Sequence, residues 1–211
     1  MTTQARHTLT VETSEEPKSG WYHGFRPAAT TRYWAAIARV LLGFTFLWAF
    51  LDKNFGLQFA TPNNQGWALG TGDGDPTFGF LKFGTNPEGP FASTFTGLRP
   101  GEAPDPNHWT NWLFMIGLLG IGLSLTLGVF MRIAAISGVV MLGLMYLAEA
   151  PWANTVDPKT GQGAFNNPIV DDHMIYAVVL IMLMLFEAGR TWGLGKVWES
   201  TSLVQSQPWL A

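Results

Sequence analysis

A run of apolar residues at Trp34–Leu51 is the feature that most constrains the fold of this chain. As a helix, this run of 18 residues extends ~27 Å, which is close to the thickness of the hydrocarbon core of a bilayer. The run ends on Asp52, Lys53 and Asn54, and such charged groups mark the place where a chain leaves hydrocarbon. The pattern predicts a membrane-spanning helix with a charged end.

The composition supports a membrane protein and excludes several kinds of chemistry. Of the 211 residues, 47% are hydrophobic and only 13% are charged, which is too few charges for an ordinary soluble surface. Cysteine is absent, so the chain cannot form a disulfide, a dithiol relay, or a thiolate-ligated zinc or iron–sulfur site. The net charge of −3 and the lack of a basic cluster argue against a nucleic-acid partner.

Three further apolar runs predict three more spans, at 112–130, 133–150 and 173–188. Only Met131 and Arg132 separate the first two of these, and so short a link predicts an antiparallel hairpin. The expected fold class is an all-α integral membrane protein. We expect a four-transmembrane-helix antiparallel bundle.

The polar segments complete the predicted organisation. Residues 1–31 are rich in Thr, Ser and Glu and read as a polar tail, and 199–211 read as a second tail. Residues 52–111 form a long Gly/Pro-rich loop, whose apolar residues predict a lid that folds over the end of the bundle. The membrane domain therefore spans 32–198.

The distribution of Lys and Arg predicts the orientation. Placing both termini in the cytoplasm puts eight basic residues inside and four outside, as the positive-inside rule favours. The long loop then lies outside the cytoplasm, and the protein is a multi-pass protein of the cytoplasmic membrane. The inner set is Arg6, Lys18, Arg26, Arg32, Arg39, Arg132, Arg190 and Lys196, and the outer set is Lys53, Lys82, Arg99 and Lys159.

The outer ends of the four predicted helices carry the candidate functional residues. Carboxylates at the membrane boundary are partly desolvated, which suits them to exchange protons during reduction of a quinone-like ring. The predicted proton-handling residues are Asp52, Glu149, Asp172 and His173. The predicted cofactor-binding residues are Lys53, His108 and Asn111.

A simpler interpretation stays open for the same residues. Asp171 or Asp172 can be an ordinary N-terminal helix cap, and the other charges can extend along the interface to reach water. Glu149 fits this interpretation least, because a carboxylate at a helix C-terminus is disfavoured by the helix dipole. The spacing of His108 and His173 matches no dense metal motif, so we predict no metal site, and no haem, flavin or iron–sulfur motif is evident.

One charge lies inside the first apolar run. Arg39 follows Trp34 by five positions, so its guanidinium must reach the interface or find a partner. Glu187 is the only acidic residue at comparable depth, at the inner end of the last run. We predict a structural Arg39–Glu187 ion pair, with a lipid headgroup or quinone as the alternative partner of Arg39.

Several short motifs, taken in order, resemble those of the DoxX/DoxD-like family of bacterial and archaeal membrane proteins. The resemblance covers about 32–198, and it rests on the order and spacing of the set. The motifs are Arg39-x-x-x-Gly43, Leu51-Asp52-Lys53, Thr77-x-Gly79-Phe80-Leu81, Gly128-x-x-x-Arg132-x-Ala134-Ala135, Glu149, Asp172-His173 and Gly189-Arg190-Thr191-Trp192-Gly193-Leu194.

The resemblance implies a four-helix membrane bundle and, for the DoxD branch, the membrane subunit of a thiosulfate:quinone oxidoreductase. The expected function is therefore that of a quinone-linked membrane oxidoreductase subunit that binds quinone without a covalent bond. Electrons would come from a protein partner. One alternative is a non-catalytic accessory subunit of a larger respiratory or redox complex, docked through small residues such as Gly120, Ser124 and Gly128. A carrier for a small solute is a further alternative.

Overall fold

The computed structural model describes residues 29–69, 74–153, 156, 163 and 165–210. In this part of the chain the regular structure is helical, and the only β pairing is an isolated bridge between Val156 and Gly163. Most of the predicted N-terminal tail, residues 1–28, lies outside the described residues.

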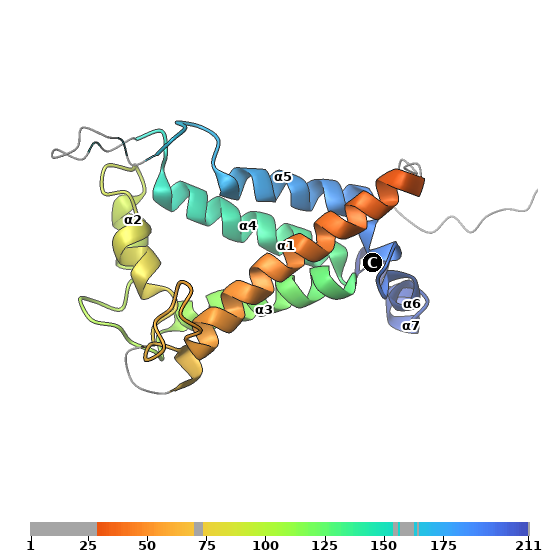
Figure 1. Cartoon of the computed structure of the whole chain (residues 1–211), viewed down its shortest axis with the longest axis horizontal. Helices are drawn as coiled ribbons and strands as arrows, with labels where there is room; N and C mark the ends of the chain where they lie inside the picture. The colour runs from red at the N-terminus through yellow and green to blue at the C-terminus, as the bar shows by residue number, and fades with distance from the viewer. Residues whose placement is uncertain (1–28, 70–73, 154–155, 157–162, 164, 211) are drawn as a thin grey trace, which may run out of the picture.

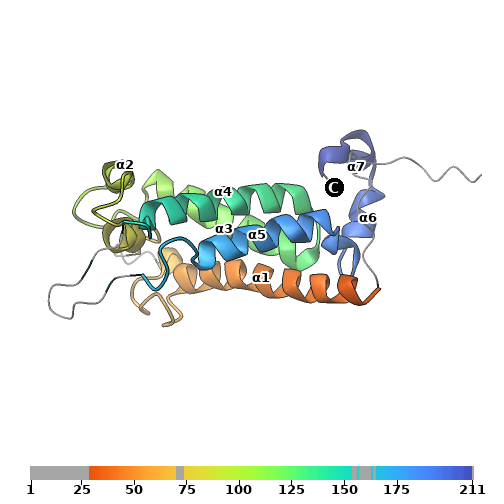
Figure 2. The same ribbon diagram turned by 90° about the horizontal axis from the view of Figure 1, so that it is seen from above.

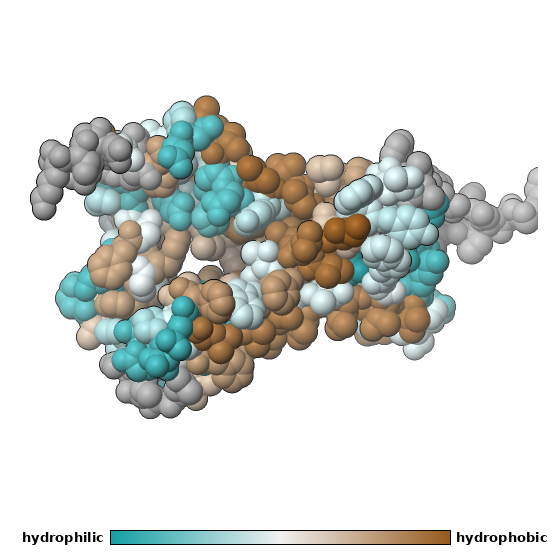
Figure 3. Space-filling view, viewed as in Figure 1, coloured by the Kyte–Doolittle hydropathy of each residue, from teal (hydrophilic) through white to brown (hydrophobic). Residues whose placement is uncertain are grey.

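Four helices lie side by side and form the body of the protein (Figures 1 and 2). They are α1 (Ala29–Phe55), α3 (Trp109–Leu127), α4 (Met131–Glu149) and α5 (Asp172–Leu185). Helix α1 packs mainly on α3, α4 packs mainly on α5, and α3 joins the two pairs through α4. Figure 3 shows apolar surface along the helices and polar surface towards both ends.

Three of these helices, α1 from Thr30, α3 and α4, are long and apolar enough to cross a membrane. This length and composition indicate a multi-pass membrane protein. Helix α5 is apolar but has only 14 residues, or ~21 Å of helix, which falls short of a ~30 Å hydrocarbon core. The predicted span 173–188 is too long, because the helix ends at Leu185 and Glu187 takes a left-handed conformation with φ 49°.

The turn between α3 and α4 differs from the prediction. Met131 and Arg132 belong to the first turn of α4, and the link consists of residues 128–130. Gly128 ends α3 in the left-handed region, with φ 75°, where a residue without a Cβ is favoured. The apolar pattern runs through this turn, which explains why the predicted boundary fell three residues late.

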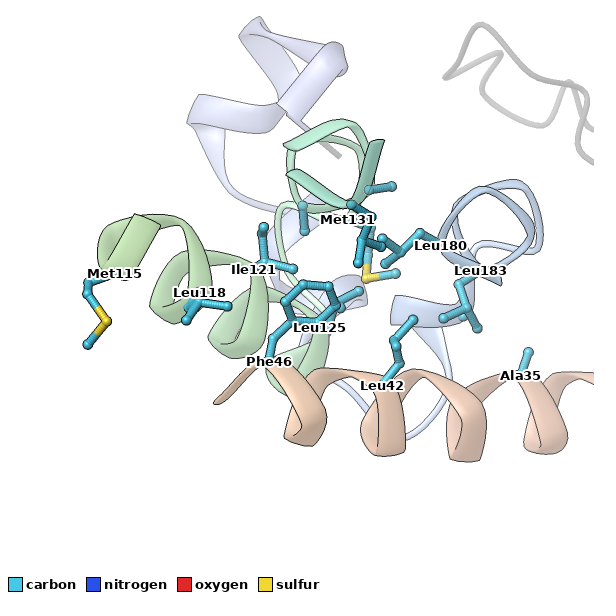
Figure 4. Close-up of a cluster of buried hydrophobic side chains, with 14 residues drawn as sticks. Ala35, Leu42, Phe46, Met115, Leu118, Ile121, Leu125, Met131, Leu180 and Leu183 are labelled. Carbon is cyan, nitrogen blue, oxygen red and sulfur yellow. The ribbon is translucent and has the colours of Figure 1, made fainter. Parts of the chain in front are cut away.

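Aliphatic and small side chains from all four helices form the core (Figure 4). Close helix contacts occur at glycines: a Cβ on Gly122 would lie 2.7 Å from the Leu47 amide nitrogen, and one on Gly138 would lie 2.5 Å from Leu180. Such close approach strengthens packing where lipid removes the hydrophobic driving force. The core residues are Ala35, Leu42, Phe46, Met115, Leu118, Ile121, Leu125, Met131, Ala134, Ala135, Leu142, Leu180, Leu183 and Ala188.

The long loop after α1 contains three short helices, η1 (Trp67–Leu69), η2 (Phe80–Gly84) and α2 (Ala92–Gly97). Its apolar residues Leu81 and Phe95 are buried against Ala148 near the end of α4. The loop therefore packs onto the end of the bundle that the sequence predicts to lie outside, which we call the outer end.

Asn86 fixes the loop to the residues that follow α4. Its side-chain amide donates to the carbonyl oxygens of Ala150 and Ala153, at 3.2 and 2.8 Å. Its backbone amide donates to the Ala148 carbonyl at 2.9 Å. A buried amide with all these bonds holds the loop in one register.

Short helices follow α5 at the opposite end of the bundle: η3 (Ala188–Arg190), α6 (Gly195–Glu199), α7 (Ser202–Ser206) and η4 (Pro208–Leu210). Arg132 at the start of α4 donates to the Pro208 carbonyl at 2.9 Å. The C-terminal segment, which includes most of the predicted tail 199–211, is thus tied to the end of the bundle that the sequence predicts to lie inside, which we call the inner end.

Candidate functional site

The predicted outer-end residues fall into two groups rather than one. In Figure 1 the outer end of α1, with Asp52 and Lys53, lies at the lower left, and the start of α5, with His173, lies at the upper left. Glu149 ends α4 beside the start of α5. In Figure 1 the pair α1 and α3 diverges from the pair α4 and α5 towards this end.

Asp52 has a local structural role. Its carboxylate is buried, with 2% of the residue exposed, and accepts hydrogen bonds from the backbone amides of Phe59 and Ala60, at 3.2 and 3.0 Å. These bonds fold the chain back on the end of α1. Asp52 therefore does not join Glu149 and His173, as the sequence predicted, because nearby backbone donors occupy its carboxylate.

Lys53 lies beside an open recess of about 480 Å³. Within the described residues its ammonium group makes no hydrogen bond and no ion pair, and the side chain is half-buried. The recess has aromatic, aliphatic and polar walls from the end of α1 and the loop. The lining residues are Lys53, Ala60, Thr61, Pro62, Gln65, Asp75, Pro76, Phe78, Gly79, Phe80, Phe83 and Pro104.

Asn111 belongs to a buried network beside the recess rather than to its wall. Its side-chain oxygen accepts from the Thr77 amide and hydroxyl, at 3.0 and 2.8 Å, and its nitrogen donates to the Asp105 carbonyl at 3.0 Å. The residue is 0% exposed. The cofactor-binding role of Asn111 stays a prediction; in this structure both its side-chain oxygen and its side-chain nitrogen hydrogen-bond to the loop.

His108, the other predicted cofactor-binding residue in this region, is half-buried, and its Nδ1 forms a hydrogen bond of 2.7 Å with the Thr110 hydroxyl. It is not part of the recess wall. Its imidazole helps to position the first turn of α3.

Asp75 is a recess residue that the sequence reasoning missed. One carboxylate oxygen accepts from the amides of Thr77 and Phe78, at 3.2 and 2.9 Å, and the other accepts from the Asp105 amide at 3.0 Å. The sequence Asp75-Pro76-Thr77 could have indicated this role, because an Asp that starts a turn commonly accepts hydrogen bonds from the amides that follow it. Asp75 thereby joins two distant parts of the loop at the recess.

The second group centres on His173 at the start of α5. The Nδ1 atom lies 2.9 Å from Asp171 Oδ2, 3.6 Å from Asp172 Oδ1 and 3.7 Å from Glu149 Oε2. The structure thus brings Glu149, Asp172 and His173 together. Asp172 is the outer member, since 70% of its side chain is exposed, against 23% for Glu149 and 11% for His173.

Asp171 both caps α5 and contacts His173. Its Oδ1 accepts from the Met174 amide at 2.9 Å, the usual bond of an N-terminal cap. Its side chain is only 12% exposed. The sequence predicted the cap but left Asp171 out of the proton-handling residues. The sequence does not show that the second carboxylate oxygen, which the cap does not use, points at His173.

The inner end contains a buried cation, and its partners correct the prediction. The Arg39 guanidinium donates through Nη1 to the carbonyls of Leu125 and Thr126, the latter at 2.9 Å. Its Nη2 donates to the carbonyls of Thr191 and Trp192, at 3.4 and 3.0 Å. Arg39 is 0% exposed, and its Nε has no partner within the described residues.

Glu187 does not contact Arg39; it pairs with Arg190 at 2.6 Å. Arg190 also lies 3.1 Å from Glu199 on α6. Burial raises the pKa of Glu199 above its ordinary value, and the charge of Arg190 opposes this. The predicted Arg39–Glu187 pair is wrong, because the last turn of α3 and the chain after η3 offer Arg39 carbonyl groups that no helix satisfies.

Glycines allow these carbonyls to surround Arg39. A Cβ on Gly128 would lie 3.0 Å from Nη1 and 2.9 Å from the Gly189 carbonyl oxygen. A Cβ on Gly193 would lie 3.1 Å from Nη2 and 2.6 Å from the same oxygen. The Gly-Arg-Thr-Trp-Gly segment therefore serves the Arg39 site, a role that its sequence alone did not indicate.

Comparison of the chain with protein-family models, with curated proteins and with solved structures returned no match. The geometry of the two outer groups is therefore the basis for a functional proposal.

Proposed function

We propose that this protein is a DoxX-like, quinone-linked subunit of a membrane oxidoreductase, and that the quinone ring binds in the recess beside Lys53. The observation that carries the proposal is an ammonium group, without an ion pair among the described residues, at an aromatic-lined recess where a membrane helix ends. The four-span bundle, its place in the cytoplasmic membrane and its cytoplasmic termini belong to the same proposal. The resemblance in the sequence motifs supports the quinone chemistry.

The chemistry of the recess suits a quinone ring. A quinone is flat and has two carbonyl acceptors, and a lysine ammonium is a donor without acceptor capacity. The rings of Phe78, Phe80 and Phe83 supply apolar contact surface, and the volume of about 480 Å³ lies in the range of small-molecule sites. Negative charge that develops on the ring during reduction would be stabilised by Lys53.

The protein partner enters the proposal because the sequence shows no motif for a haem, a flavin or an iron–sulfur cluster. A donor subunit would supply the electrons, and the quinone would receive them at the outer end of α1. The role of Lys53 would then be to bind the ring and stabilise its reduced form, with the fixed carboxylate of Asp75 holding the wall of the recess.

The test is the affinity for quinone. We would purify the full chain in mild detergent, extract and quantify bound quinone, and titrate a short-chain quinone by quenching of tryptophan fluorescence. Replacing Lys53 by Met removes a charge-assisted hydrogen bond worth ~1.5–3 kcal/mol, so the affinity should fall ~10- to 100-fold. Lys196→Met, at an exposed site on α6, is the matched control and should bind as the wild type does.

Equal, trace quinone in all three proteins would contradict the proposal and favour the accessory subunit. One observation supports that second candidate: a Cβ on Gly120 or Gly143 would meet no atom within 4 Å, so a partner helix has room to approach there. Gly120→Leu should then release the partner without changing the fold, which co-purification from the native membrane would show.

A further inference from the structure

The cluster at the start of α5 offers three metal-ligating side chains from two segments. Glu149 ends α4, and Asp171 and His173 lie at the beginning of α5. One ligand atom from each lies within 4.8 Å of the other two. Their side chains are 23%, 12% and 11% exposed, so the group is set into the protein rather than spread on its surface.

We propose that Glu149, Asp171 and His173 bind one divalent transition-metal ion, with Mn²⁺ and Zn²⁺ as the test ions. Ligand atoms around an ion at ~2.1 Å lie ~3.0 Å apart at a right angle and ~3.4 Å apart in a tetrahedron. The separations from His173 Nδ1, 2.9 Å to Asp171 Oδ2 and 3.7 Å to Glu149 Oε2, bracket these values. The three ligand atoms all lie within 4.8 Å of one another, and side-chain rotations that bring them closer would complete the site.

The balance of charge at the cluster points to a cation. Three carboxylates, those of Glu149, Asp171 and Asp172, have an oxygen within 4 Å of one imidazole nitrogen. A protonated imidazole would offset only one of these charges. Among the described residues, no Lys or Arg forms an ion pair with any of the three. Glu149 and Asp171 are mostly buried, where a charge that is not compensated is costly.

The donor types select the class of ion. One imidazole nitrogen with carboxylate oxygens suits Mn²⁺, Fe²⁺ or Zn²⁺, whereas Ca²⁺ and Mg²⁺ prefer oxygen alone. The Met174 amide holds Asp171 Oδ1 at 2.9 Å and leaves Oδ2 directed at His173. Such an outer hydrogen bond orients a ligand before the ion arrives.

This inference goes beyond the quinone recess, and it replaces both the prediction of no metal site and the predicted proton-handling role of Glu149 and His173. A bound ion uses the lone pairs that a proton carrier needs. Since Lys53 and the recess belong to the other outer group, quinone binding and metal binding are measured separately.

The experiment uses the full chain in detergent after removal of metal with EDTA. Mn²⁺ is titrated, and the loss of the free-ion EPR signal gives the stoichiometry and the affinity. We expect one Mn²⁺ per chain, displaced by Zn²⁺ and not by an equal concentration of Mg²⁺. Sub-stoichiometric binding, or equal displacement by Mg²⁺, would overturn the proposal.

Two variants and two controls locate the ion. Glu149→Gln and His173→Gln each remove a ligand and should weaken binding at least ~10-fold. His108→Gln, the outer histidine away from the cluster, and Glu102→Gln, a carboxylate that is 84% exposed, should bind normally. Unchanged binding in the first pair would overturn the proposal.

A measurement on the wild-type protein guards against variants that fail to fold. Electron spin-echo modulation of the Mn²⁺-loaded chain should show coupling to a directly bound ¹⁴N nucleus, because His173 supplies the one nitrogen ligand. Bound Mn²⁺ without this ¹⁴N coupling would contradict the assignment.

Discussion

The two ends of the bundle differ in what surrounds their charged side chains. At the inner end one cation, Arg39, is fully buried and surrounded by backbone carbonyl oxygens of Leu125, Thr126, Thr191 and Trp192. At the outer end, carboxylates gather around His173, and Lys53 faces the recess with no ion pair or hydrogen bond among the described residues. Arg39 and Asp52 are held by backbone groups of the fold, whereas Lys53 and the cluster at His173 remain available to ligands.

This difference teaches how to separate structural from functional charges in such a protein. A buried charge costs free energy unless hydrogen bonds compensate it. Arg39 is compensated at both of its Nη atoms, so its role is to join α1 to the ends of α3 and η3. Lys53 makes no hydrogen bond or ion pair within the described residues, and the three carboxylates at His173 share a single imidazole, which is why the functional proposals concern them.

Removing Arg39 should have the largest effect. Arg39→Met leaves its carbonyl partners without a donor, at ~1–3 kcal/mol for each buried group that stays unpaired. We expect a loss of more than ~3 kcal/mol in the free energy of unfolding, measured by titration with SDS in mixed micelles.

Arg39→Lys is the matched control for charge. It keeps a cation but replaces the planar fork by a single ammonium, which cannot span two carbonyl pairs. We expect an intermediate stability. If Arg39→Met has the same free energy of unfolding as the wild type, Arg39 does not have the structural role that distinguishes the inner end from the outer end.

Replacing Gly128, the glycine beside Arg39, should have the second largest effect on stability. Gly128→Ala places a Cβ at 2.9 Å from the Gly189 carbonyl oxygen in a residue with φ +75°. Left-handed backbone strain alone costs ~1–3 kcal/mol for a residue with a side chain. Thermal unfolding followed by tryptophan fluorescence should show a clearly lower Tm.

Gly120→Ala provides the control on the same helix, since a Cβ there meets nothing within 4 Å. Alanine inside a helix is favoured over glycine by ~0.5–1 kcal/mol, so this variant should be as stable as the wild type or more so. Equal destabilisation of both variants would show that the Arg39 site does not depend on close approach at Gly128.

The sequence predicted what depends on local pattern. Apolar runs located α1, α3 and α4, which have the length to cross a membrane. The neighbouring ends of two antiparallel helices brought Glu149 to His173 at 3.7 Å, because residues at such ends are close whatever the detailed packing. The resemblance to the DoxX/DoxD-like family, the fourth span and the quinone remain predictions.

What the sequence missed depends on backbone groups and on bond direction. Backbone carbonyls leave no trace in residue types, so Glu187 appeared to be the natural partner of Arg39. Asp52 was taken for a site residue because its carboxylate is conspicuous, although the Phe59 and Ala60 amides occupy it. The end of α5 was missed because Phe186 and Glu187 continue an acceptable helical composition while their backbone leaves the helix.

Replacing Glu187 should have the smallest effect on stability, and this prediction tests which residue pairs with Glu187 at the inner end. The Glu187–Arg190 pair is exposed, at 46% and 44% of the side chains, and such pairs contribute ~0–1 kcal/mol. Glu187→Gln should therefore change the free energy of unfolding by less than ~1 kcal/mol.

A double-mutant cycle decides between the two possible partners of Glu187: coupling to Arg190 should be small but measurable, and coupling to Arg39 should be absent. Strong coupling to Arg39 would restore the ion pair and would mean that carbonyl groups alone do not compensate the buried guanidinium.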